Sequence, residues 1–192
     1  INSISYNPDA FEIDSIPESK YMLNKTPSKY IFARLNDIAD IIHKYDIFVK
    51  PTNDLKSFTG TFVKQGKSLR EALEDKKENI DLTQDFYVLV SLRCPRIIEE
   101  ARCFVVDHSV VTCGRYARNG VTDITHFKND EESIYKSFAQ EYIDNVYFPS
   151  NSFTIDLCKT DEDELLVVEY NCFNCSGLYN VDTTKLIKAL QG

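Results

Sequence analysis

The sequence lacks any long apolar run and any glycine-rich nucleotide motif. No apolar stretch approaches the roughly 20 residues that a membrane-spanning helix needs. The first 20 residues have no basic start and no continuous apolar core, so we expect neither a membrane segment nor a signal peptide. The Gly-x-Gly-x-x-Gly and Walker patterns are both absent, which argues against a βαβ dinucleotide fold.

Basic charge is also in short supply. The 192 residues carry 30 acidic and 22 basic side chains, a net charge of -8. Proteins that bind nucleic acid through charge usually present a basic face, so we expect no nucleic-acid partner. A hydrophobic content of 43% and a charged content of 27% are typical of a folded, soluble protein, with one domain or two small lobes.

Histidines and cysteines give no recognisable catalytic pattern. None of the three histidines has a hydroxyl or thiol partner at a known spacing, so a His-based triad is not supported. The six cysteines lie in or beside predicted strands, and none falls in the first 93 residues. Three disulfides are one reading, but we expect buried free thiols in a reducing, cytoplasmic setting. Cys172 and Cys175 have no second ligand pair at zinc-finger spacing.

The hydrophobic periodicity predicts a mixed fold. Helices are expected from Thr26 to about Tyr45, from Ser68 to about Asn79, over 134–146, and after the capping residue Asp182. Strands are expected over 46–51, 61–64 and 85–92, as a pair joined at Asp107-His108 within 100–120, and as a hairpin of 152–158 with 164–171. Hairpins mixed with helices favour an α+β fold with largely antiparallel sheets.

The strongest chemical pattern lies in the last predicted hairpin. Glu169 and Asn171 alternate onto one face of an apolar strand, and Asp156 can lie across from Glu169 on that face. Two carboxylates and an amide oxygen suit magnesium, with phosphate completing the shell. The alternative is an ordinary hydrogen-bond network in which Asp156 caps a turn and Asn171 bonds to backbone.

Two groups of basic residues could bind anions. Lys50 and Lys56 flank a loop that ends at Gly60, although a surface position is the common fate of a lysine. Five of the seven arginines fall between residues 93 and 118, where no lysine occurs. This clustering suggests an anion pocket, with pairing to Glu99 and Glu100 as the alternative. The five are Arg93, Arg96, Arg102, Arg115 and Arg118.

Taken in order, several stretches resemble the ATP-grasp superfamily, and in particular its compact domains from phage and bacterial genomes. The stretches lie between about residues 45 and 190, and the most specific is "VVEYNCFNCSGLY" at 167–179. The others are "FVKP" with "LKSFTG", "FYVLVS", "EARCFVVDHSVV" and "FTIDL". The resemblance implies an ATP-dependent ligase fold, in which two α+β lobes grip the nucleotide between them.

The resemblance also implies roles for individual residues. Lys50 and Lys56 would contact phosphate, the backbone of the strand containing Val88 and Val90 would bind adenine, and Glu100 would hold the ribose hydroxyls. Magnesium would be bound by Asp156, Glu169 and Asn171. Arg102, in an E-x-R pattern, would face substrate or phosphate.

The chain departs from the family pattern at three places. The glycine-rich loop is reduced to Phe58-Thr59-Gly60. Thr154 stands where several ligases have an arginine, so Arg115 or Arg118 would have to replace it; we take Arg102 and Arg115 as the catalytic candidates. Residues 1–45 would be a lead-in or a remnant of a substrate domain, 46–92 the first lobe and hinge, and 93–192 the second lobe with the metal site.

The expected function is ATP- and Mg²⁺-dependent ligation of a carboxylate to an amine through an acyl phosphate. The carboxylate acceptor would be a small molecule, a peptide or a protein. Two alternatives remain at this point: a non-catalytic nucleotide-binding or protein-interaction module, and a metal-free structural protein. Phosphoryl transfer needs cationic side chains and a metal but no side-chain nucleophile, which agrees with the missing triad.

Overall fold

The computed structural model describes residues 7–52, 57–78, 80–128 and 130–192. Two compact units are present. The C-terminal unit consists of residues up to Phe11, Ser15–Pro17 and Pro95–Gly192, and the N-terminal unit consists of Glu12–Asp14 and Glu18–Cys94. Residues 18–45, which we expected in a separate lead-in, are thus part of the N-terminal unit. Within the described ranges, no helix has the length and apolar character to cross a membrane.

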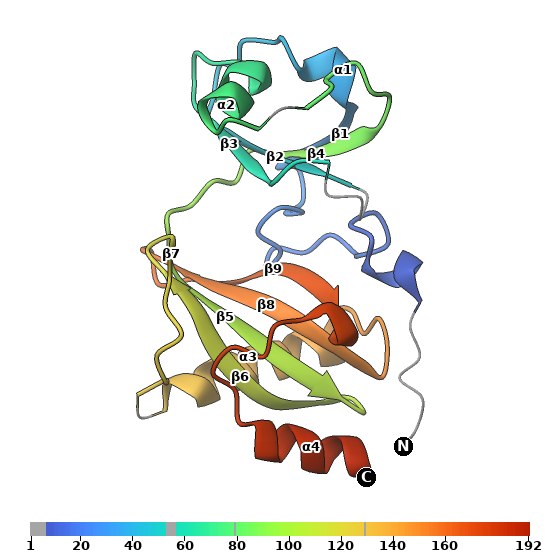
Figure 1. Ribbon diagram of the computed structural model, residues 1–192, viewed down its shortest axis with the longest axis vertical. Helices are drawn as coiled ribbons and strands as arrows, with labels where there is room; N and C mark the ends of the chain where they lie inside the picture. The colour runs from blue at the N-terminus through green and yellow to red at the C-terminus, as the bar shows by residue number, and fades with distance from the viewer. Residues whose placement is uncertain (1–6, 53–56, 79, 129) are drawn as a thin grey trace. The chain divides into compact units, whose positions relative to one another are not determined.

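The N-terminal unit is a four-stranded antiparallel sheet with two short helices on one face (Figure 1). The strand order is β1-β4-β2-β3, from β1 (Tyr30–Arg34), β4 (Tyr87–Ser91), β2 (Ile47–Pro51) and β3 (Thr61–Val63). Helices α1 (Leu35–Ile38) and α2 (Leu69–Asp75) share a buried core with alternate side chains of the strands. The predicted capping box is confirmed, because Ser68 and Glu71 cap each other at the start of α2.

The predicted helix from Thr26 to about Tyr45 is wrong. Residues 30–34 form β1, which pairs along its whole length with β4, and only Leu35–Ile38 is helical. The spacing of Ile31, Leu35 and Ile38 fits a helix, but Ile31 is 61% exposed whereas Leu35 and Ile38 are buried. Pairing with the buried strand β4 has outweighed the local helical pattern.

The C-terminal unit is a five-stranded antiparallel sheet of order β7-β6-β5-β8-β9. Its strands are β5 (Ile97–Val106), β6 (Ser109–Arg118), β7 (Val121–Thr122), β8 (Ser152–Thr160) and β9 (Leu165–Cys172). Its helices are η1 (Pro8–Phe11), α3 (Glu131–Asn145), η2 (Phe173–Cys175) and α4 (Thr183–Gln191). Both predicted hairpins, the helix around 134–146 and the helix capped by Asp182 are confirmed. The α+β class with antiparallel sheets is confirmed as well.

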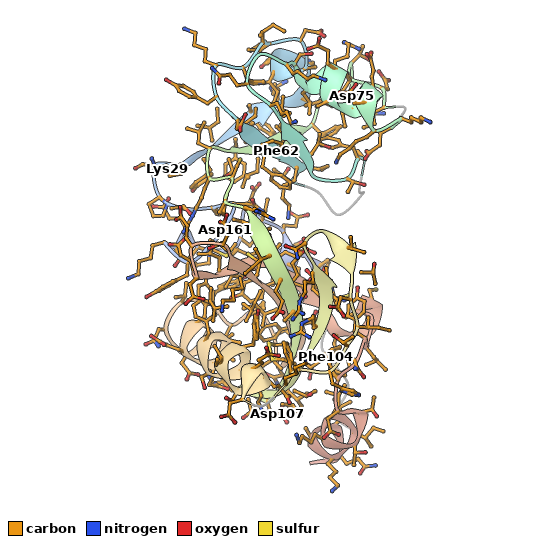
Figure 2. All side chains as sticks on the ribbon, turned by 90° about the vertical axis from the view of Figure 1, so that its left-hand side faces the viewer. Lys29, Phe62, Asp75, Phe104, Asp107 and Asp161 are labelled. Atoms are coloured by element: carbon orange, nitrogen blue, oxygen red, sulfur yellow. A yellow bond between two sulfur atoms is a disulfide. The ribbon has the colours of Figure 1, made fainter. Side chains whose placement is uncertain are left out.

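The two faces of this sheet have different coverings. Helix α3 lies behind the sheet in Figure 1, whereas the chain from β9 to α4 passes in front of it. We call the α3 side the covered face and the other side the open face. On the open face, Phe104 packs with Val181 and Leu186, so α4 and its preceding loop cover one end. Figure 2 shows Phe104 at that end of the sheet and Asp161 at the opposite end. The polar residues discussed below lie on the part of the open face that α4 leaves uncovered.

One expectation about the cysteines is corrected. Cys103 and Cys113 lie directly opposite each other in the β5–β6 pair and form a disulfide. The other four cysteines, Cys94, Cys158, Cys172 and Cys175, are free thiols. The expectation of free thiols throughout missed this pair because it depends on the strand register, which local sequence does not specify.

Candidate active site on the open face

Three charged residues form a row across the C-terminal sheet. Arg102 on β5 lies directly opposite Asp156 on β8, and Asp156 lies directly opposite Glu169 on β9. Asn171 is two residues beyond Glu169 and therefore shares its face. The predicted approach of Asp156, Glu169 and Asn171 is confirmed, and Arg102 joins them.

These side chains are linked by short hydrogen bonds. Arg102 donates from Nε and Nη2 to the two oxygens of Asp156, both at 2.7 Å. Asn171 Nδ2 donates to Asp156 Oδ2 at 3.3 Å and to Glu169 Oε1 at 3.2 Å. Asp156 is only 2% exposed and Arg102 only 9%, so the ion pair is shielded from water. A bidentate pair of this kind fixes the orientation of both groups.

The site carries more negative than positive charge. Burial raises the pKa of Asp156 to about 6 against the opposing effect of Arg102, and the charges of Glu169 and Glu100 raise it further. The pKa of Glu100 is also raised, chiefly by burial and in part by the charge of Glu169. Three carboxyl groups thus interact electrostatically around one guanidinium. Such an arrangement favours an added cation.

The donor set fits a hard cation. Magnesium in proteins is commonly held by one or two carboxylates together with substrate phosphate oxygens. In the described part of the chain, no three His, Cys, Asp or Glu side chains are already arranged to hold a metal ion. The set here consists of two carboxylates and an amide. The amide of Asn171 points its nitrogen at both carboxylates, so binding through Oδ1 requires the amide to rotate.

Glu100 is positioned by a β-bulge. Along β6, Ala117 lies opposite Glu100 and Arg115 lies opposite Ala101, so Tyr116 is the extra, unpaired residue. A bulge of this kind re-aims the side chain it carries. The Tyr116 hydroxyl donates to Glu100 Oε2 at 3.0 Å, which leaves Oε1 for another partner.

The same bulge places Arg115 on the covered face, away from the open-face residues. Arg115 is 1% exposed and donates from Nε to Glu99 Oε2 at 2.8 Å and from Nη2 to Glu131 Oε2 at 2.9 Å. Arg118 donates to the same Glu99 oxygen at 2.7 Å. The alternative weighed for the arginines, pairing with Glu99, therefore holds for Arg115 and Arg118. The structure does not bring Arg115 together with Arg102.

The predicted nucleotide contacts of the N-terminal unit are placed only in part. Lys50 alternates with the buried Val49 and so lies on the sheet face opposite α1 and α2. Val88 and Val90 have core side chains, and strands flank them on both sides. An adenine contact through their backbone stays a prediction, and it requires ladder hydrogen bonds to open. Lys56 lies outside the described residues.

Sequence reasoning gave no role to two aromatic residues at the site. Tyr116 and Tyr179 stack with ring centroids 5.1 Å apart, and both rings lie near the guanidinium of Arg102. Tyr179 lies in the stretch that carried the family resemblance, two residues after Gly177. Its position eight residues after Asn171, in a loop, was the available signal.

Comparison with solved structures identifies the class of fold. The D-alanine-D-alanine ligase from Coxiella burnetii is similar with a TM-score of 0.50 and 16% identity, over 83% of this chain and 47% of that chain. Two further similar structures are the ATP-grasp ligase PsnB complexed with minimal precursor (TM-score 0.49, 15% identity, 84% and 53% covered) and an L-amino acid ligase from Bacillus licheniformis (0.49, 16%, 77% and 38%). The chain therefore spans about half the length of such ligases or less. The fold is the ATP-grasp fold.

The family is defined more closely by the sequence. The model of an ATP-grasp domain family, the third family of its clade, matches residues 11–190. The chain belongs to this family. A search of the curated proteins finds no match to the chain.

Proposed function

We propose that the chain is the nucleotide-binding and catalytic part of an ATP- and Mg²⁺-dependent ligase that joins a carboxylate to an amine through an acyl phosphate. The observation that carries the proposal is the open-face cluster, in which Glu100, Asp156 and Glu169 interact around the single guanidinium of Arg102. The membership of an ATP-grasp family supports the choice of ATP as the substrate. The similarity to a D-alanine-D-alanine ligase supports the carboxylate–amine reaction class.

The proposed metal ligands are Asp156, Glu169 and Asn171. Magnesium, when bound, would neutralise phosphate oxygens and so lower the barrier to phosphoryl transfer. Arg102 holds Asp156 in one orientation through its two hydrogen bonds, which prepares the carboxylate for a ligand. Asn171 then changes from donating to both carboxylates to offering its amide oxygen.

Glu100 and Lys50 are the proposed nucleotide contacts in the two units. Glu100 Oε1 would accept from a ribose hydroxyl, while the Tyr116 hydroxyl holds Oε2. Lys50 would contact phosphate, as would Lys56, which lies outside the described residues. These roles come from the family resemblance. In the wider reaction, a carboxylate oxygen of the acceptor attacks the γ-phosphorus of ATP and ADP leaves. The amine then attacks the acyl carbon and releases phosphate.

The test is ADP release by the full chain with ATP, magnesium, and paired carboxylate and amine substrates such as amino acids and short peptides. We expect ADP to form only with a productive pair, and Glu169→Gln to reduce turnover by at least about 100-fold. Glu162→Gln makes the same change in the exposed β8–β9 turn and should retain full activity. A Glu169→Gln variant as active as the wild type would contradict the proposal.

A second candidate function is a non-catalytic nucleotide-binding or protein-interaction module. It is favoured by the Arg102–Asp156 pair, because both oxygens of Asp156 already accept hydrogen bonds from arginine. Calorimetry separates the two candidates. Magnesium-dependent ATP binding without ADP release in any substrate mixture would support the module and overturn the ligase.

A further inference from the structure

An aromatic pair is attached to the arginine of the candidate site. The ring of Tyr116 comes from β6, and the ring of Tyr179 comes from the loop between η2 and α4. The rings stack with an interplanar angle of 24°. Arg102 Cζ lies 5.2 Å from the Tyr179 centroid and 5.9 Å from the Tyr116 centroid. Both distances are within the range of cation–π attraction.

The loop that carries Tyr179 is fixed against the sheet. A Cβ at Gly114 would lie 2.9 Å from a methyl of Val181, so the close approach of the loop to β6 requires glycine at this position. Asp182 N donates to Thr112 Oγ1 at 3.1 Å, and Asn180 Nδ2 donates to Ile124 O at 2.7 Å. Gly114 lies directly opposite Arg102 in the β5–β6 pair. The loop therefore crosses the row of charged residues at the position where β6 contributes no side chain.

The backbone of Tyr179 is itself constrained. Its φ is 47°, in the left-handed region that large side chains rarely adopt, and the residue is 45% exposed. The conformation costs free energy, which the contacts of the ring must offset. Those contacts are with Tyr116, with Arg102 and with the backbone of Gly177, where an added Cβ would lie 3.4 Å from the ring.

Arg102 has one nitrogen left for a ligand. Nε and Nη2 bond to Asp156, and Nη1 donates to no group among the residues that the structure describes. We propose that Tyr179, stacked on Tyr116, is a positioning residue that holds the Arg102 guanidinium so that Nη1 faces an oxyanion of the substrate. The ligand is then a phosphate or carboxylate oxygen, and this inference rests on the proposed function for its substrate class.

The experiment uses two readouts on the full chain. The first is the solvent exchange of the Arg102 Nε–H proton, followed by ¹⁵N NMR, which needs no ligand. The second is the Kd of a non-hydrolysable ATP analogue with magnesium, measured by calorimetry. Tyr179→Leu removes the aromatic face but keeps an apolar side chain, Tyr179→Phe keeps the ring, and Leu178→Ala tests an exposed neighbour in the same loop.

For Tyr179→Leu we expect exchange at Arg102 Nε to accelerate and the Kd to rise, each by about tenfold. Tyr179→Phe and Leu178→Ala should remain within about twofold of the wild type, because cation–π stacking does not need the hydroxyl. Rescue by phenylalanine distinguishes positioning by the ring from a general effect on the loop. If Tyr179→Leu fails to fold, a wild-type Kd and exchange rate in Tyr179→Phe together with losses in Tyr179→His, which keeps a planar ring but weakens the π face, would decide in favour.

The inference is overturned if Tyr179→Leu leaves both the exchange rate and the Kd unchanged, or if Tyr179→Phe loses as much as the leucine variant. Failure of the proposed function has a different signature. A wild-type chain that binds no nucleotide would remove the substrate class, while the exchange readout would still report whether Tyr179 positions Arg102.

Discussion

The two faces of the C-terminal sheet use the same residue types to opposite ends. On the covered face, Arg115 and Arg118 meet Glu99 and Glu131, so two guanidinium groups balance two carboxylates. Tyr135 from α3 donates to the remaining oxygen of Glu99 at 2.8 Å. On the open face, Glu100, Asp156 and Glu169 share one guanidinium, that of Arg102. The covered face is electrostatically complete, whereas the open face has an excess of negative charge that a bound cation would relieve.

The neighbours Glu99 and Glu100 show the difference most clearly. Burial raises the pKa of Glu99, but hydrogen bonds from Arg118, Tyr135 and Arg115 lower it by more, so its pKa falls below the usual value. The pKa of Glu100 rises instead, because burial and the charge of Glu169 outweigh the bond from Tyr116. One residue stabilises the fold, and the next is kept available for a ligand. We infer that balance of charge separates structural from functional clusters in this domain.

The largest expected effect comes from breaking the balance of the covered face. Arg115→Met leaves Glu99 and Glu131 without their buried partner, and we expect a loss of about 3–5 kcal/mol in the free energy of unfolding. Denaturant unfolding followed by circular dichroism measures it. Arg118→Met is the matched control, since Arg118 is 45% exposed at its side chain and should cost less than about 1 kcal/mol. Equal losses for the two variants would contradict a buried network centred on Arg115.

A smaller effect separates two identical substitutions on the two faces. Glu131→Gln removes a charged acceptor from Arg115 and from Lys128 N, and should cost about 1 kcal/mol of stability. Glu169→Gln removes one of the crowded carboxylates, so its stability should lie within about 0.5 kcal/mol of the wild type or above it. Thermal unfolding without metal measures both. A clear destabilisation by Glu169→Gln would mean that the open face is structural as well.

The smallest effect is in proton binding. Carboxyl ¹³C NMR should find that Glu99 titrates below 4.5 and Glu100 above it. Because the folded-state pKa of Glu99 is lowered, its contribution to stability is present above the unfolded value and is lost as the pH falls through the folded value. The variant Glu99→Gln should lack this acid-dependent loss. Titration of both carboxyl groups on the same side of 4.5 would remove the contrast between the faces.

The sequence predicted most of the C-terminal unit and the central part of the site. Strand alternation was sufficient to place Glu169 and Asn171 on one face and Asp156 opposite, because these residues lie on well-marked apolar strands. It was not sufficient for Arg115. In a regular strand Arg115 and Arg118 would lie on opposite faces, and the bulge at Tyr116 brings both to Glu99.

Other features depend on distant parts of the chain. Strand β1 was predicted as a helix because its pairing with β4 joins residues about 60 positions apart, beyond the reach of local periodicity. The contact of Tyr179 with Tyr116 and Arg102 has the same origin, since it joins a loop to two strands. Such contacts are set by register and by bulges, which the local pattern does not specify.

The most direct test of the account is to locate a divalent cation by NMR with Mn²⁺ as a probe, in the presence of a non-hydrolysable ATP analogue. Paramagnetic broadening falls steeply with distance from the ion. At a low ratio of Mn²⁺ to protein, we predict that the side-chain amide signal of Asn171 broadens first while the Nε–H signal of Arg115 stays sharp, and that Glu169→Gln abolishes the broadening. Broadening of Arg115 before Asn171, or no selective broadening at all, would contradict a cation site on the open face.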